Sequence, residues 1–198
     1  MGMFEIALAL FFMANPIGGV PVFVSLVKDF DFHRQRVILF REALISLVLA
    51  YLFLFLGQPF VEYLHIETFA IKLSGGVIVF LYAVQMIFPV HTEAKSTKLL
   101  TEPFVVPIAT PLISGAGVFA MIVVLSKQAP LAIVCGAIFL AWLVVIAVVV
   151  SSAFLQKILG KRGLIALEQL MGLILMMMAV GLFTGGMNLF LARLHGVN

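Results

Sequence analysis

Six long apolar stretches, separated by short polar connections, run through the whole chain. A transmembrane helix needs about 20 consecutive apolar residues, and each stretch reaches roughly that length. The pattern therefore predicts transmembrane helices at Phe4–Val27, Ile38–Phe60, Phe69–Val90, Phe104–Leu125, Leu131–Gln156 and Leu164–Leu191. Strands of a membrane barrel would instead alternate apolar and polar residues over about 10 positions. We expect an all-α integral membrane protein with a single membrane domain over residues 1–198.

Residues that interrupt helices lie inside the first and the fourth stretch. The first contains "MANPIGGVPV" (13–22) and the fourth contains "ATPLISGAG" (109–117). Asparagine is favoured as the N-cap of a helix, and proline as its first residue. The pairs Asn15-Pro16 and Thr110-Pro111 therefore predict that one helix ends and another begins within each stretch. A single proline often only kinks a transmembrane helix, and this alternative stays open for either pair taken alone.

The two halves of the chain share a pattern at a nearly constant interval. "ANPI" (14–17) resembles "ATPL" (109–112), and "GGVIVFLYAV" (75–84) resembles "MGLILMMMAV" (171–180). Each half then holds an odd number of spans, so the second half enters the membrane inverted relative to the first. We expect two inverted three-helix repeats, about residues 1–94 and 95–198, although apolar segments also align by chance.

The predicted broken helices would create a binding site inside the membrane. A restarted helix exposes backbone N–H groups, which lipid tolerates only where they are buried in protein or line a cavity. The positive end of the helix dipole favours an anionic group such as a carboxylate. Interrupted segments at matching places in two halves are also typical of a transporter site. The predicted substrate-binding residues are Asn15, Pro16, Gly18, Gly19, Pro21, Thr110, Pro111, Ser114, Gly115 and Gly117.

The composition excludes a soluble domain. Of the 198 residues, 64% are hydrophobic and 11% are charged, and the mean hydropathy is +1.24. A soluble domain has roughly 45–50% apolar and 25% charged residues. The single cysteine, Cys135, cannot form an internal disulfide, and the sequence holds no spaced set of metal ligands. We therefore predict neither a metal nor a cofactor.

The distribution of basic residues predicts the orientation. The net charge is +3, but Lys and Arg lie in short connections, which indicates topology rather than nucleic-acid binding. The first, third and fifth connections carry Lys28, Arg34, Arg36, Arg41, Lys95, Lys98, Lys157, Lys161 and Arg162. The opposite side carries Lys72, Lys127 and Arg193. The excess of positive charge places the odd connections in the cytoplasm and both termini on the outer side.

Several polar residues within or beside the spans are further candidates. Arg41 and Glu42 lie at the start of the second span, and Glu168 lies at the start of the sixth. An intramembrane carboxylate can carry a proton or bind a cation, whereas a charge near a span end can also simply reach the interface. Ser74 and Gln85 are candidates for lining a pathway, or for bonding a neighbouring helix.

Five segments of the chain also carry a resemblance to a known family. They are "NPIGGVPVFVSL" (15–26), "RE" (41–42), "SGGVIVFLYAVQMIF" (74–88), "PFVVPIATPLISGAG" (103–117) and "ALEQLMGLILMMMA" (166–179). In these segments the chain resembles the MarC family of six-helix bacterial inner-membrane proteins, which is similar in fold to the LysE-type exporters. Some members are assigned as neutral amino-acid transporters, while those named for multiple antibiotic resistance have no assigned substrate. The resemblance implies a multi-pass transporter of the bacterial inner membrane, and the outer side that the charge distribution assigns to both termini would then be the periplasm.

These patterns favour a secondary transporter or exporter of a small solute, most simply a neutral amino acid or a similar carboxylate-bearing metabolite. The expected partners are that solute and the lipid bilayer, without nucleic acid, and the small size is compatible with a homodimer. No enzymatic activity is expected, because the sequence has no HExxH or GxGD motif and its aspartates, Asp29 and Asp31, lie in a connection. A non-transporting scaffold or accessory subunit is the main alternative, and a passive channel is another.

Overall fold

The computed structural model of the chain describes residues 2–88 and 108–195, apart from the side chains of residues 110–112 and 161. These residues form helices and short connections, without a strand. In chain order the elements are α1 (Met3–Ala14), α2 (Val20–Val27), α3 (Phe32–Tyr63), α4 (Thr68–Ile87), the π-helix η1 (Ile108–Ile113), α5 (Ala116–Ser126), α6 (Leu131–Val150) and α7 (Ser152–Leu194). The predicted all-α membrane fold is confirmed.

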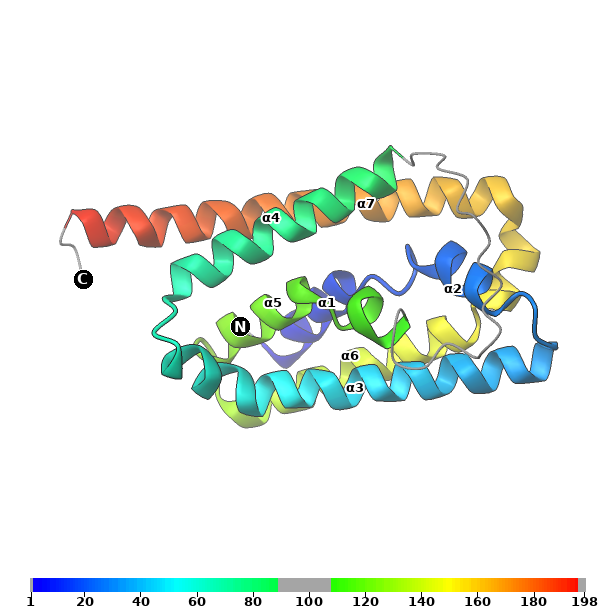
Figure 1. Cartoon of the computed structure of the whole chain (residues 1–198), viewed down its shortest axis with the longest axis horizontal. Helices are drawn as coiled ribbons and strands as arrows, with labels where there is room; N and C mark the ends of the chain where they lie inside the picture. The colour runs from blue at the N-terminus through cyan, green and yellow to red at the C-terminus, as the bar shows by residue number, and fades with distance from the viewer. Residues whose placement is uncertain (1, 89–107, 196–198) are drawn as a thin grey trace.

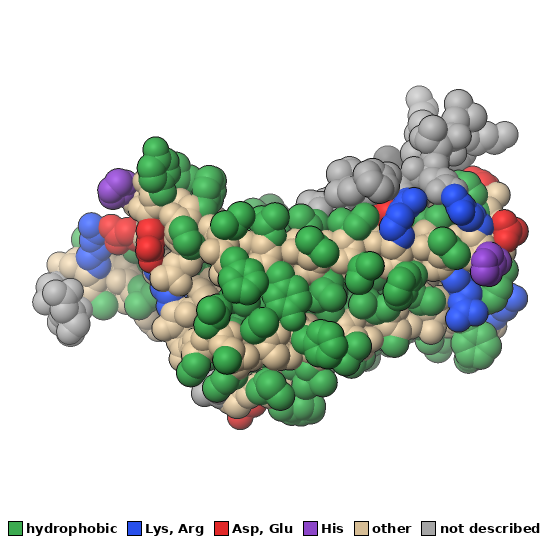
Figure 2. Space-filling view, turned by 90° about the horizontal axis from the view of Figure 1, so that it is seen from below, with side chains coloured by type: hydrophobic (Ala, Val, Ile, Leu, Met, Phe, Trp, Pro, Cys, Tyr) green, Lys and Arg blue, Asp and Glu red, His purple; other side chains and the backbone are tan. Residues whose placement is uncertain are grey.

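Four of the described helical segments are long and apolar enough to cross a bilayer: α3, α4, α6 and the part of α7 from Arg162 to Leu194. Between 33 and 39% of each apolar window is buried inside the molecule, so most of each helix faces outward. Figure 2 shows hydrophobic side chains over the middle of the molecule and charged ones toward its two ends. This distribution suits a protein that lipid surrounds at mid-height and water surrounds at both ends.

Contacts between distant segments show which connections share an end of the bundle. At one end, the Lys157 ammonium lies 5.0 Å from the centre of the Phe32 ring, so the start of α7 adjoins the start of α3. At the other end, Arg193 in the last turn of α7 pairs with Glu67, the residue before α4. The long helices therefore run alternately between the two ends, and α7 ends on the side where α1 begins (Figure 1).

Both expected helix interruptions are present; the first is buried, and the second is partly exposed. α1 ends at Ala14 and α2 begins at Val20, while η1 ends at Ile113 and α5 begins at Ala116. Figure 1 shows α1 and α5 in the centre of the bundle, where the two helices are in contact. Asn15, Gly18 and Gly19 are buried at the first interruption, so protein surrounds its backbone. At the second interruption Ser114 is buried, Gly115 is half buried and Ala116 is exposed.

The second interruption lies later in the chain than predicted. Thr110 and Pro111 lie inside η1, and α5 takes Gly115, with its extended backbone, as N-cap. The prediction that Thr110-Pro111 starts the new helix is wrong. Pro111 is only the fourth residue of η1, where a backbone nitrogen has no partner within the helix in any case, so the proline does not end it.

The fifth predicted span also ends earlier than expected. The apolar pattern extends to Gln156, but α6 ends at Val150 and α7 begins at Ser152. α7 then bends at Gly160, whose φ of 60° lies in the left-handed region that favours glycine. The short first part of α7 therefore joins α6 to the long part of α7 across one end of the bundle (Figure 1). Lys95, Lys98, the prolines at 103 and 107, and the predicted span ends at Val90 and Phe104 lie outside the described residues.

α4 and α7 form the most extensive helix pair among the described elements. A Cβ atom on Gly76 would lie 2.9 Å from the carbonyl oxygen of Ala179, and one on Gly172 would lie 3.2 Å from that of Ala83. Glycine permits this close approach because it has no side chain. The two segments that align between the halves of the sequence thus pack against each other, each glycine facing the alanine of the other helix.

Candidate functional site

Asn15 organises the first interruption. It ends α1 with a left-handed backbone (φ 49°, ψ 48°) and is only 4% exposed. Its side-chain oxygen accepts a hydrogen bond from the Gly18 amide (3.3 Å), and its carbonyl accepts one from the Gly19 amide (3.1 Å). Its side-chain nitrogen donates to the sulfur of Met86 in α4 (3.2 Å). Asn15 thus caps the turn that precedes α2, and the backbone at this break is largely satisfied from within.

The second interruption leaves backbone donors free. No side chain caps Gly115, and the first amide of α5 that bonds back along the chain is that of Phe119, to the Gly115 carbonyl (3.0 Å). The amides of Ala116, Gly117 and Val118 therefore donate to no group within the described part of the chain. We call these three groups the free α5 amides. They lie at the positive end of the α5 dipole.

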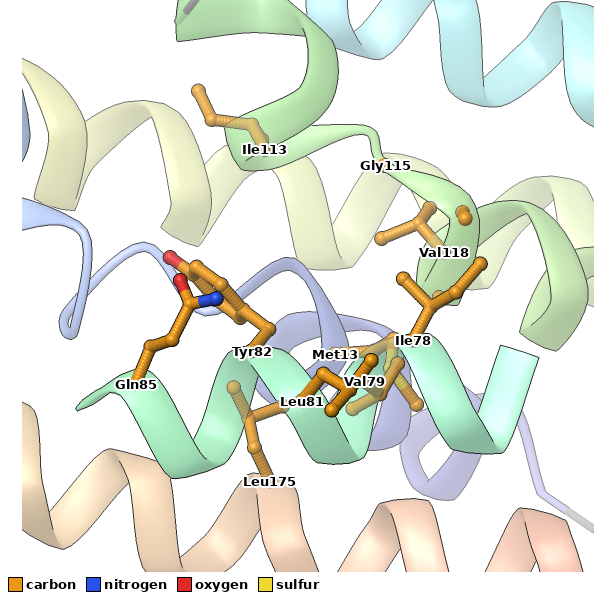
Figure 3. A pocket seen from close by; sticks show the side chains of 12 residues that line it. Met13, Ile78, Val79, Leu81, Tyr82, Gln85, Ile113, Gly115, Val118 and Leu175 are labelled. Carbon is orange, nitrogen blue, oxygen red and sulfur yellow. The ribbon is translucent and has the colours of Figure 1, made fainter. Parts of the chain in front are cut away.

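A cavity of about 350 Å³ lies against the free α5 amides (Figure 3). Its walls come from α1, α4, η1, α5 and α7, and its lining residues are Met13, Ile78, Val79, Leu81, Tyr82, Gln85, Ile113, Gly115, Ala116, Gly117, Val118 and Leu175. The polar side chains in this lining are those of Tyr82 and Gln85, which extend from the same side of α4. A solute there would meet amide donors on one wall, two polar side chains on another, and apolar groups elsewhere.

Two glycines permit the close packing beside this cavity. A Cβ atom on Gly117 would lie 2.4 Å from a methyl carbon of Val79 and 3.0 Å from the sulfur of Met13. A Cβ atom on Gly18 would lie 2.3 Å from the terminal methyl of Met86. A larger residue at position 117 would collide with the stiff side chain of Val79, whereas one at position 18 would first displace the flexible end of Met86.

Buried polar side chains hold the second interruption to α3 and α6. The Ser114 hydroxyl donates to the carbonyl of Ser46 in α3 (2.8 Å), and the indole N–H of Trp142 in α6 donates to the Ser46 hydroxyl (2.9 Å). One turn earlier on α3, Glu42 is fully buried and accepts a hydrogen bond from Arg41 (3.0 Å). The buried carboxylate of Glu42 therefore lies one turn along α3 from Ser46, the residue that holds the second interruption.

Comparison with known proteins identifies the family. The model of the family described as "MarC family integral membrane protein" matches residues 2–191. The chain belongs to the MarC family. Among its curated relatives, the UPF0056 inner membrane protein YhgN of Escherichia coli (strain K12) is 37% identical over 189 residues, which cover 93% of this chain and 95% of that protein.

Other MarC relatives come from distant bacteria. The UPF0056 membrane protein BU449 of Buchnera aphidicola is 35% identical over 176 residues, which cover 88% of this chain and 90% of that protein. A UPF0056 membrane protein of Chlamydia pneumoniae is 30% identical over 188 residues, covering 93% of each chain. No solved structure matches the chain. The expected MarC membership is confirmed, and none of these printed names states a substrate.

The structure of this MarC protein brings some of the predicted site residues to the cavity. Gly115, Gly117 and Gln85 line it, while Ser114 is buried beside it and bonds to α3. Ser74 is not among the lining residues, and its hydroxyl donates to the Ile71 carbonyl one turn back (3.2 Å). Of the two pathway candidates on α4, only Gln85 lies at the cavity.

The predicted residues of the first interruption lie behind the cavity wall. Asn15, Pro16, Gly18 and Gly19 are buried, and Pro21, the second residue of α2, is half buried. They shape the wall through Met86 and the end of α1 and are not among its lining residues. The side chains of Thr110 and Pro111 lie outside the described part of the chain.

The three charged candidates do not line the cavity either. Arg41 and Glu42 form an ion pair on α3, and Glu168 is half buried on α7. Of these, Glu42 is the most enclosed, with none of its surface exposed.

Sequence reasoning missed most of the cavity wall. The sequence analysis did not single out Met13, Val79, Tyr82 or Leu175, which the fold brings together. Tyr82 could have been predicted from the sequence, because it precedes the candidate Gln85 by three residues and so lies on the same face of the helix. The other three carry no signal beyond hydrophobicity.

Proposed function

We propose that this MarC protein is a secondary transporter or exporter of a small solute with a carboxylate and an apolar body, such as a neutral amino acid with an aliphatic side chain. The observation that carries the proposal is the cavity of about 350 Å³ against the free α5 amides, inside a membrane protein. An open volume with unsatisfied donors at a helix interruption is typical of membrane transporters.

The free α5 amides would bind the carboxylate. Three consecutive N–H groups at a helix start point toward an anion, and the helix dipole adds a favourable field. Gly117 and Val118 are buried, whereas Ala116 is exposed at the mouth of the cavity. A hydrogen bond from the two buried amides to an anion would be stronger than one at a fully hydrated surface. The absence of a capping side chain on Gly115 leaves that position open to a ligand.

The rest of the lining matches the other parts of such a solute. Met13, Val79 and Leu175 offer apolar contact for an aliphatic body. The Tyr82 hydroxyl and the Gln85 carbonyl oxygen are acceptors for an ammonium group. No charged side chain lines the cavity in the described residues, which favours a solute with no net charge.

Glu42 is our candidate for coupling transport to a proton gradient. Its carboxylate is fully buried and paired with Arg41, and Ser46, one turn away, bonds to Ser114 at the second interruption. Protonation would weaken the pair with Arg41 on the helix that holds the break, and intramembrane carboxylates serve as proton relays in pumps and transporters. Alternating access would then come from one half of the protein rocking against the other.

The test is solute counterflow in proteoliposomes. We expect purified wild-type protein to exchange radiolabelled neutral amino acids, with leucine as the first probe. Gly117→Val should reduce exchange at least about tenfold, because its side chain would overlap Val79 and displace solute. The matched control is Gly181→Val, since a Cβ atom at Gly181 meets nothing within 4 Å.

Two results would contradict the proposal. One is wild-type protein that exchanges no neutral amino acid or monocarboxylate at any imposed pH gradient. The other is Gly117→Val protein that is folded and exchanges leucine as fast as the Gly181→Val control.

A further inference from the structure

A second hollow, separate from the cavity, lies on the outer surface of the α4–α7 pair. It is a groove of about 270 Å³, lined by Gly76, Val77, Phe80, Leu81, Ala179, Val180 and Phe183. The lining is wholly apolar, and Val77, Phe80, Val180 and Phe183 are each about two-fifths exposed or more. The groove therefore opens to the surroundings of the protein, which at this height are lipid.

Packing between the two helices explains why the groove exists. Gly76 has no side chain and lies close to the backbone of Ala179, so no side chain at position 76 fills the bottom of the groove. Phe80 on α4 and Phe183 on α7 stand on either side of the groove. The walls are rigid aromatic rings, so the groove does not need to open before something enters it.

A lysine lies at one end of the groove. Lys72 precedes Gly76 by one turn on the same side of α4. Its ammonium nitrogen lies 3.7 Å from the position that a Cβ atom of Gly185 would occupy, so its side chain reaches across to α7. Within the described part of the chain, this ammonium makes no hydrogen bond or ion pair.

The other cations at this end of the bundle have partners. Lys127 donates to the Thr68 hydroxyl (3.1 Å), and Arg193 pairs with Glu67. Lys72 differs from them in having an apolar groove beside it instead of a polar neighbour. An uncompensated positive charge beside apolar surface attracts a molecule with a negative group and an apolar tail.

The depth of Lys72 suits a lipid headgroup. It is the fifth residue of α4, which begins at Thr68, so it lies about 6 Å along the helix from that end, near the interface. From Lys72 to Phe80 the helix rises about 12 Å toward the bilayer centre. An acyl chain attached to a phosphate at Lys72 would run along the groove over that distance.

We propose that this groove is a specific site for one anionic phospholipid, with its phosphate at the Lys72 ammonium and one acyl chain between Phe80 and Phe183. A headgroup with net negative charge is favoured over a zwitterionic one, because Lys72 lacks a neutralising carboxylate within the described residues. The site shares Leu81 with the wall of the cavity, so a bound lipid would support that wall. The proposal does not depend on what the cavity binds.

The experiment is native mass spectrometry of the full chain in detergent, titrated with dioleoyl phosphatidylglycerol or dioleoyl phosphatidylcholine. Wild-type protein should retain the anionic lipid at least tenfold more tightly than the zwitterionic one. Lys72→Gln should abolish this preference, and Lys72→Arg should keep it. Lys127→Gln is the matched control, because Lys127 lies at the same end of the bundle but is bonded to Thr68, and it should behave as wild type.

A groove-filling variant tests the acyl-chain part. Val180→Phe places a ring in the groove from an exposed position and should weaken binding of both lipids. The proposal is overturned if wild-type protein shows no preference for the anionic lipid, or if Lys72→Gln and Lys127→Gln lose it equally. It is also overturned if glycerol 3-phosphate binds as tightly as the lipid, or if Val180→Phe dissociates a dimer while lipid binding is unchanged, since a second copy would then occupy the groove.

Discussion

Asn15, which ends α1, and Gly115, which precedes α5, have opposite consequences for the backbone amides that follow them. Asn15 carries a side chain that accepts the Gly18 amide, so the first interruption satisfies its own donors. Gly115 carries none, so the free α5 amides stay open. The cavity lies at the second break, the one with the free α5 amides.

At Asn15, alanine should destabilise the protein more than glycine does. Asn15→Ala loses the bond to the Gly18 amide and forces alanine into a left-handed backbone; we expect a loss of about 2–3 kcal/mol in unfolding free energy. Asn15→Gly loses only the bond and should be about 1 kcal/mol more stable than Asn15→Ala, the reverse of their order within a helix. Reversible unfolding in mixed micelles measures both values. Equal stability of the two variants would show that the left-handed backbone is not maintained in the membrane.

At the scale of elements, the α4–α7 pair is the firmest support for the proposed inverted repeat. Gly76 faces Ala179, Gly172 faces Ala83, and a Cβ atom on Gly186 would lie 3.0 Å from the carbonyl oxygen of Phe69. Such reciprocal contacts between segments that align in sequence are what a two-fold axis in the membrane plane would produce. The opposite directions of the first and fourth broken segments agree with it (Figure 1).

Close packing of these helices gives a prediction about glycine. Gly76→Ala puts a methyl group 2.9 Å from backbone atoms of Ala179 and Phe183, which cannot move without shifting α7. We expect a loss of about 1–3 kcal/mol in unfolding free energy, measured in mixed micelles. Gly181→Ala on α7 is the control; it meets nothing within 4 Å and should be neutral or slightly stabilising. If the two variants unfold alike, the helices are farther apart than described.

At the scale of the whole molecule, the connections divide into two sets at opposite ends. Lys127 bonds to Thr68 near the paired Arg193, and the Lys157 ammonium lies over the Phe32 ring at the other end. The excess of Lys and Arg at the second end predicts that it faces the cytoplasm.

Cysteine labelling in intact cells tests this arrangement. In a Cys135→Ala background, Lys127→Cys and His195→Cys should react with a membrane-impermeant maleimide from outside. Asp29→Cys and Lys157→Cys should react only after the cells are permeabilised. If the first two variants react only after permeabilisation and the last two react from outside, the predicted orientation is wrong but the arrangement of the helices stands. If the two variants of one pair react differently, those two residues do not lie at the same end of the bundle.

The sequence by itself determined the class of the protein and the approximate place of its broken helices. Span length and hydrophobicity are local properties, because a bilayer requires a continuous apolar segment whatever surrounds it. The Asn15-Pro16 pair marked the place of the first break, but its predicted role as N-cap and first residue of the new helix is wrong. Asn15 ends α1 with a left-handed backbone, and α2 begins only at Val20, after Gly19. The proline–glycine segments likewise indicated a resemblance to the MarC family, which the family match confirms.

Tertiary structure alone decided which break opens to a cavity, and which residues surround it. Thr110-Pro111 looked like a helix start, but Gly115 became one because η1 continues past the proline to Ile113. Met13, Val79 and Leu175 come from three distant helices, and nothing in an apolar residue's own segment states what it will face. In the sequence, Lys72 was only one of three basic residues assigned to the outer side, and the packing of α4 on α7 set an apolar groove beside it. The bilayer sets the length and hydrophobicity of each span, so both can be predicted from the local sequence. A binding site depends on which distant segments pack together, so it can be seen only in the tertiary structure.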